Sequence, residues 1–154
     1  MSRAETFLVV IDDTPECRQA LRFAALRARR VGAGLALLHV IAPAQFVQWG
    51  RVQETLEAEA RAAADALLDR AAEEAAGWYG RRPETHVRHG KPGEAVLAFL
   101  EENPSIRSLV LAAAARGKPG PLVDFFTGER AGALPCLLMV VPGGLADSDL
   151  DRLS

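Results

Sequence analysis

The sequence has little of what marks a secreted, membrane-embedded or nucleic-acid-binding protein. Its two cysteines, Cys17 and Cys136, lie far apart without metal-ligand spacing, as in a reducing compartment, and their apolar contexts favour small core residues over reactive thiols. No apolar run approaches the ~20 residues of a membrane span, and residues 1–6 show no signal-peptide pattern. A net charge of -2 gives no positive electrostatic potential that would attract nucleic acid or anionic lipid. We therefore expect a cytoplasmic protein with no membrane and no nucleic-acid partner.

Strand and helix patterns alternate along the 154 residues, which suffice for one domain with its own core. Strict alternation favours a single-domain α/β fold with a Rossmann-like parallel five-stranded sheet, order 3-2-1-4-5, and helices on both faces. Apolar runs predict buried strands, and a more polar run, 84–89, predicts an edge strand. The five predicted strands are 7–11, 35–41, 84–89, 109–115 and 137–141.

Three peripheral segments have more than one interpretation. Residues 1–144 are expected to form the domain, and 145–154 a short acidic C-terminal tail that is either a frayed turn or a small docking element. The loop before the long second helix holds Phe46 and Trp49, which either cover a pocket or anchor the loop on the core. The many acidic residues of the helix at 51–76 indicate a solvated face.

The segment 108–129 is the strongest site candidate in the chain. A buried apolar strand there leads into a cationic turn containing Gly117, Lys118 and Gly120, and then into a helix start. Such a layout aims free backbone N–H groups and the positive end of a helix at an anion. A glycine- and proline-rich turn is also what an α/β protein uses as a plain connector, so the loop alone does not decide between the two.

The topology predicts a ligand crevice where the first and fourth strands part at their carboxyl ends. Those ends are Asp12-Asp13 and the loop at 113–120. Asp13 or Thr14 is also placed to cap the next helix. His39 in the second strand is more typical of a hydrogen-bonded structural residue than of a catalyst. We find no nucleophile, base and orienting group together, so we expect no enzyme, with weak ATP hydrolysis as an open alternative.

With these residues placed, the chain resembles the universal stress protein (UspA-like) family over nearly its whole length. The matching pieces, in family order and spacing, are LVVIDDTPECRQALRFA, LALLHV, Gly90, LVLAAAARGKPGPLVDFFTGE and LPCLLMVVP. The resemblance implies a cytoplasmic stress-response or regulatory protein, usually a homodimer joined through its closing strand, which often binds ATP or another adenine nucleotide. It implies that Asp12 contacts the adenosine part and that the backbone of Val40 meets the adenine.

The family's phosphate motif, Gly-x-x-Gly, nine residues, then Gly-Ser or Gly-Thr, is incomplete in this chain. Its first glycine falls near Ala113, the pair Gly117 and Gly120 is followed by only seven residues before Gly128, and Glu129 replaces the hydroxyl. A carboxylate at that position repels phosphate oxygens. The candidate nucleotide-binding residues are Asp12, Asp13, Val40, Gly117, Lys118, Gly120 and Gly128.

The incomplete motif leaves a second function open. The chain is then a homodimeric interaction module that does not bind ATP and acts on an unknown protein partner. In either case the apolar strand from Leu137 to Val141 would be an aggregation hazard if its edge stayed bare. We therefore expect this strand to pair with a second copy across a two-fold axis.

Overall fold

Five parallel strands form one sheet in the order β3-β2-β1-β4-β5, in a computed structural model that describes residues 5–43 and 50–154. This order and the parallel pairing of every neighbouring strand confirm the predicted α/β fold class. The strands are β1 (Thr6–Val10), β2 (Gly34–Ile41), β3 (Glu84–His89), β4 (Ile106–Ala113) and β5 (Leu137–Pro142). The helices are α1 (Cys17–Val31), α2 (Gly50–Tyr79), α3 (Pro92–Glu102), α4 (Pro121–Thr127), the 3-10 helix η1 (Ala131–Ala133) and α5 (Asp147–Leu153).

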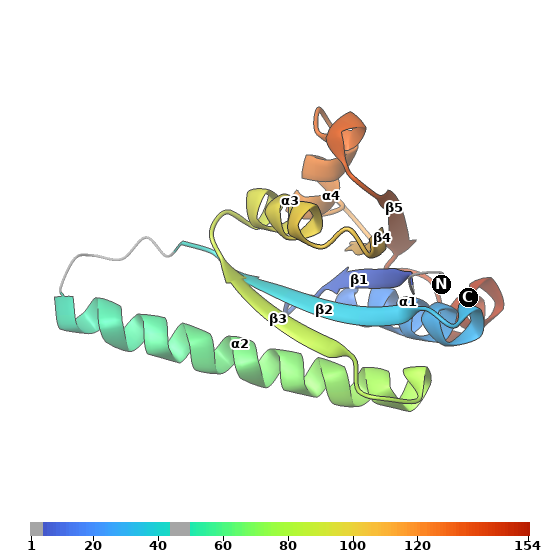
Figure 1. Cartoon of the computed structure of the whole chain (residues 1–154), viewed down its shortest axis with the longest axis horizontal. Coiled ribbons are helices and arrows are strands. Elements are labelled where there is room, and N and C mark those ends of the chain that lie inside the picture. Colours follow the sequence, from blue (N-terminus) through green and yellow to red (C-terminus); the bar gives the residue numbers. More distant parts are fainter. Residues whose placement is uncertain (1–4, 44–49) are drawn as a thin grey trace.

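Helices cover both faces of the sheet, as predicted. Because side chains alternate between the two faces of a strand, neighbouring residues pack against different layers. In β1, Phe7 and Val9 belong to the core that includes α1 and α2, whereas Leu8 belongs to the core that includes α3 and α4. Figure 1 shows α2 on one side of the sheet and α3 and α4 on the other. The central strands β1 and β4 are therefore buried from both sides.

Alanine lets α1 lie close against the sheet. Ala24, Ala25 and Ala28 have no exposed surface, and a larger side chain at any of them would push the helix away. Gly32 ends the helix with φ 68°, a left-handed conformation that glycine adopts without a Cβ clash. Its N–H bonds back to the carbonyl groups of the last turn.

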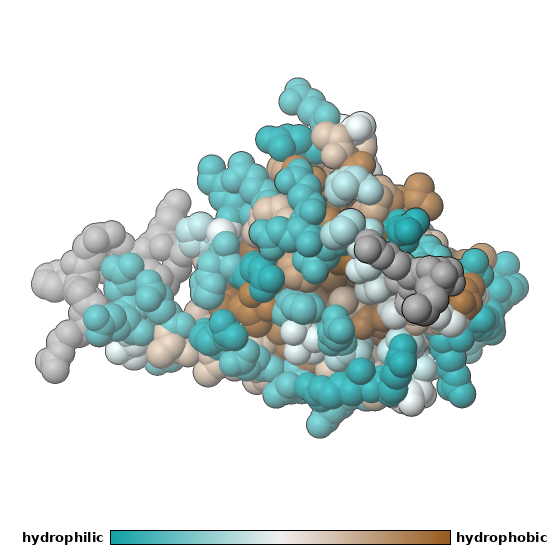
Figure 2. Space-filling view, in the orientation of Figure 1, coloured by the Kyte–Doolittle hydropathy of each residue, from teal (hydrophilic) through white to brown (hydrophobic). Residues whose placement is uncertain are grey.

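The outer side of α2 is polar. Leu68, Ala72 and Ala75 are buried against the sheet layer, and the charged side chains between them are exposed. Figure 2 shows hydrophilic residues along the helix. In the two described ranges, no helix has both the length and the apolar character needed to cross a membrane. The aromatic residues of the preceding loop, Phe46 and Trp49, lie outside the described residues.

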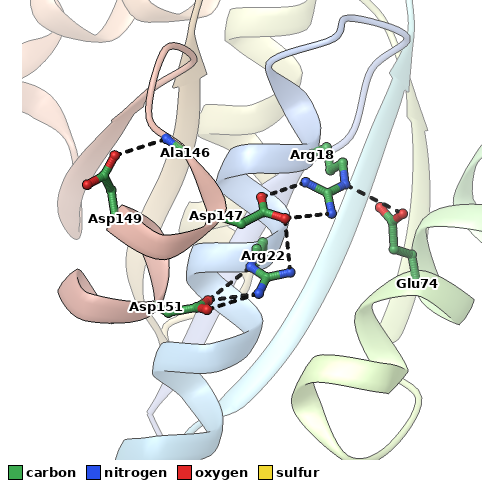
Figure 3. A network of polar contacts seen from close by, with 7 residues as sticks. All are labelled: Arg18, Arg22, Glu74, Ala146, Asp147, Asp149 and Asp151. Atoms are coloured by element: carbon green, nitrogen blue, oxygen red, sulfur yellow. Dashed lines mark hydrogen bonds and ion pairs between the residues drawn. The ribbon is translucent and has the colours of Figure 1, made fainter.

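The acidic tail contains a docked helix, α5, rather than a frayed turn. Leu150 of α5 is completely buried in the core that α1 and α2 share. Arg18 of α1 donates to Asp147 at 2.8 Å, and Arg22 donates to Asp151 at 2.9 Å (Figure 3). The hydrogen bond from the Arg18 guanidinium lowers the pKa of Asp147. A buried leucine and two arginine–carboxylate contacts therefore hold the end of the chain on α1.

Candidate functional site

A cavity of about 240 Å³ lies where β1 and β4 part, at the predicted edge of the sheet. Its walls are the end of β1 with the following turn, the end of β2, the end of β4 and the first turn of α4. Pro92, at the start of α3, closes another part of the wall. Parallel strands bring these segments together because their carboxyl ends share one edge. The predicted crevice is therefore present.

The turn after β1 places Asp12 at the crevice. One carboxylate oxygen, Oδ1, accepts hydrogen bonds from the backbone N–H of Thr14 at 3.1 Å and from the Thr14 hydroxyl. In the described part of the chain, no donor reaches the second oxygen, Oδ2. The carboxylate is thus held by one oxygen, and the other can accept a hydrogen bond from a ligand.

The start of α1 differs from the expected capping. The residue before the helix is Glu16, which makes no side-chain capping bond, so the expectation that Asp13 or Thr14 caps α1 is wrong. The reason is that Thr14 is engaged with Asp12 in the preceding turn, and the helix begins only at Cys17. Glu16 instead lines the crevice, where it adds a second carboxylate.

Cys17 lines the crevice as a buried thiol. Its Sγ lies 3.8 Å from the carbonyl oxygen of Val10. Burial raises the pKa of the Cys17 thiol to about 12. The thiolate, which is the reactive form of cysteine, is therefore scarce at neutral pH. This agrees with the predicted structural role of the residue.

His39 acts as a structural link between β2 and the end of β1. Its Nδ1 lies 2.6 Å from the carbonyl oxygen of Ile11, while the Ile11 N–H donates to the carbonyl of Leu38 at 2.7 Å. The predicted hydrogen-bonded role is confirmed. The ring and the neighbouring Val40 both line the crevice, so β2 supplies one side of it.

The loop between β4 and α4 reaches the crevice only at its end, through Pro119 and Gly120, and two of its glycines adopt positive φ. Gly117 has φ 76° and Gly120 has φ 125°, conformations that side chains with a Cβ rarely take. β4 ends at Ala113, two residues before the predicted end, because the N–H of Ala114 turns to the carbonyl of Pro119 at 3.0 Å. Pro121, the first residue of α4, has no N–H to offer an anion.

The structure brings together three of the seven predicted nucleotide-binding residues. Asp12, Val40 and Gly120 line the crevice. The other four do not line it: Asp13, Gly117, Lys118 and Gly128. Gly128 lies at the far end of α4, roughly 12 Å along the helix axis from Gly120 at a rise of about 1.5 Å per residue.

Sequence reasoning missed two features of the crevice. Glu16 was not expected there, although its position just before an apolar helical stripe was a usable signal. The side chains of Leu122 and Val123 form an apolar wall of the crevice. Their position there depends on how α4 packs against the sheet, which the sequence pattern did not predict. Among the described residues that line the crevice there is no lysine or arginine, and the titratable groups are the two carboxylates, His39 and the buried thiol of Cys17.

Comparisons with known proteins agree with this fold. The model of the universal stress protein family matches residues 4–123. The chain is similar to the universal stress protein UspA from Lactobacillus plantarum, with TM-score 0.70 and 23% identity over 92% of this chain and 99% of that one. No curated protein matches the sequence.

Two further similar structures were solved with nucleotides. One is the universal stress protein from Archaeoglobus fulgidus in complex with dAMP, with TM-score 0.54 and 19% identity over 92% of this chain and 98% of that one. The other is a universal stress protein family protein from Arabidopsis thaliana with AMP bound, with TM-score 0.58 and 12% identity over 90% and 91% of the two chains. At these identities the likeness shows the shared fold.

Proposed function

Because the chain belongs to the universal stress protein family, we propose that it is a cytoplasmic stress-response or regulatory protein whose crevice binds an adenine mononucleotide. The observation that carries the proposal is the carboxylate of Asp12 at the β1/β4 crevice, which is held through one oxygen, while no donor of the described residues reaches the other. A ribose hydroxyl can donate to that oxygen. The AMP and dAMP bound to two similar proteins support the choice of an adenine nucleotide.

The size and charge of the crevice favour a monophosphate over ATP. A volume of about 240 Å³ is below the ~300–1,000 Å³ of typical ligand pockets, so it suits a nucleoside whose phosphate lies outside. Asp12 and Glu16 line the crevice without a lysine or arginine among its described lining residues. Each added phosphate brings negative charge closer to these carboxylates, and the repulsion grows in a partly dry site.

A thermal-shift titration with AMP, ADP and ATP, each with and without magnesium, tests the proposal. Ligand that binds only the folded state raises the melting temperature by mass action. At a concentration 100 times Kd, a stabilisation of about 2.7 kcal/mol corresponds to a rise of roughly 5–10 °C for a chain of this size. We expect the largest rise with AMP and the smallest with ATP.

A pair of glycine variants locates the binding site. Gly120→Val places a side chain at the crevice wall and should remove the AMP-induced rise. Gly117→Val introduces a side chain at another positive-φ position of the same loop, outside the crevice lining, and should keep the rise relative to its own unliganded melting temperature. No rise at millimolar nucleotide with the unmodified protein would refute the proposal and favour the interaction module that binds no ATP.

We also propose that the protein is a homodimer that pairs through β5. This strand lies at the edge of the sheet, so one side of its backbone has no neighbouring strand. Leu137 and Val140 on β5 are exposed at 71% and 37%. An apolar edge strand of this kind is stable in water when a second strand covers it.

Light scattering at micromolar concentration tests the dimer, with Leu137→Arg as the disrupting variant. Because Leu137 is mostly exposed, the substitution should leave the fold intact while placing a charged side chain of each chain in the proposed interface. We expect the mass of two chains for the unmodified protein and of one chain for the variant. Val31→Arg changes an exposed apolar residue of α1 and should leave the mass unchanged. A single-chain mass for the unmodified protein would exclude the dimer.

A further inference from the structure

A second cavity, of about 300 Å³, lies at the amino ends of the strands, on the opposite side of the sheet from the crevice at their carboxyl ends. It is formed by the first residues of β1, β2 and β3 and by the segment that follows α2. Hydroxyl groups of Thr6 and Tyr79 line it together with the guanidinium groups of Arg81 and Arg82 and the carboxylate of Glu84. This lining suits a small charged ligand better than an apolar one.

The guanidinium of Arg81 is held in place by a buried anchor. Its Nε and Nη2 donate to the hydroxyl oxygen of Tyr79 at 3.1 and 2.7 Å. The Tyr79 hydroxyl in turn donates to the carbonyl oxygen of Ala33 at 3.0 Å, and only 7% of Tyr79 is exposed. An arginine oriented in this way loses less conformational entropy when it binds a ligand than a freely moving one.

The anchor occupies one edge of the guanidinium, and no acceptor among the described residues lies on the other. A guanidinium carries five N–H donors, and the Tyr79 hydroxyl uses the Nε–Nη2 edge. The two N–H groups of Nη1 and the second N–H of Nη2 remain. One N–H of Nη1 and the remaining N–H of Nη2 point the same way and form a fork that matches two oxygens of one anion. The acceptor at the occupied edge is a neutral phenol, so it does not compensate the positive charge.

The charge of Arg81 has no acidic partner in the described ranges 5–43 and 50–154, where no carboxylate lies within ion-pair distance of it. The neighbouring Arg82 differs, because it pairs with Asp69 at 2.7 Å. Glu84 lines the same cavity. Its carboxylate oxygen Oε2 lies 3.5 Å from the ring nitrogen Nε2 of His86. Arg81 is therefore the cation available to a ligand, and Glu84 is the group that opposes an anion.

From this arrangement we propose that the cavity is a binding site for a small phosphoryl anion, which accepts two hydrogen bonds from the Nη1–Nη2 edge of Arg81. The ligand is inorganic phosphate or the phosphate of a small monoester, and Glu84 limits its affinity. The site lies at the amino ends of the strands, so it is separate from the nucleotide crevice and does not depend on the function proposed for it.

An NMR titration of backbone amides with inorganic phosphate, at constant ionic strength with chloride as the balancing anion, tests this site. We expect saturable shifts at residues 33–35 and 79–84. Arg81→Gln should weaken binding about tenfold, because the charge and the fork are both lost. Glu84→Gln should tighten binding about two- to threefold, because a repelling charge is removed. A parallel titration with glycerol phosphate shows whether the monoester or free phosphate binds more tightly.

Two control variants make the result specific. Arg107→Gln removes an exposed arginine that lines a different cavity with Glu5, and its phosphate affinity should be unchanged. Arg81→Lys keeps the charge and loses the fork, so it should lose most of the affinity if the contact is bidentate. No saturation below about 100 mM would overturn the proposal. Equal weakening in Arg81→Gln and Arg107→Gln, or shifts confined to the crevice, would also overturn it.

Discussion

Phe126→Ala is expected to lower the free energy of unfolding by about 3–5 kcal/mol, because it removes a completely buried aromatic side chain. Phe126 anchors α4, which has only seven residues and is too short to be a stable helix without tertiary packing. Its ring packs edge-on against Phe125, with 4.9 Å between ring centroids. Since Leu122 and Val123 of the same helix form a crevice wall, the loss should also weaken AMP binding.

Urea denaturation followed by circular dichroism measures this loss, and Phe126→Leu is its matched control. Leucine keeps most of the buried apolar volume, so its cost should stay below about 1.5 kcal/mol. A loss below about 1 kcal/mol for Phe126→Ala would mean that α4 does not pack as the structure shows. A normal AMP-induced rise in that variant would mean that α4 is not needed as a wall of the site.

Leu150→Ala is expected to cost about 2–5 kcal/mol, because Leu150 fills a place in the core beneath α5 and has no exposed surface. The arginine contacts to Asp147 and Asp151 are partly exposed to solvent, so we expect them to contribute less than the buried leucine. Without the leucine, α5 should separate from α1 and its amides should exchange with solvent. The last residues of the chain are thus predicted to be part of the folded core.

The exposed residue of the same helix provides the control. Leu153 is 49% exposed, so Leu153→Ala should change the stability by no more than about 0.5 kcal/mol. Hydrogen exchange of residues 147–153 together with urea denaturation distinguishes the two variants. Similar losses in both, or unchanged protection of α5 in Leu150→Ala, would contradict the docking of this helix.

Much of the candidate site could be predicted from local signals. The apolar runs 7–11 and 109–115 mark two strand ends to within two residues, and strict alternation places both ends on the same side of the sheet. Gly120 was predicted from the glycine and proline pattern of the loop, and it does line the crevice. These inferences succeeded because strand ends and positive-φ turns depend on residues close together in the sequence.

The other predicted site residues show where local signals fail. Asp13 is adjacent to Asp12 in the turn after β1, but only Asp12 lines the crevice. Lys118 and Gly117 belong to the right loop, but that loop folds so that only its end reaches the cavity. Glu16 enters the crevice because α1 begins at Cys17, a start that no capping residue marks.

The sequence by itself determined the α/β class, the order of the strands and the edge of the sheet that holds the crevice. Hydrophobic periodicity and the right-handed winding of parallel strands leave few other solutions. Only the tertiary structure decided that the acidic tail docks through Leu150, that Glu16 joins Asp12, and that Arg81 is anchored on Tyr79. These contacts join residues distant in the sequence or depend on how a turn orients its side chains, so no local pattern encodes them.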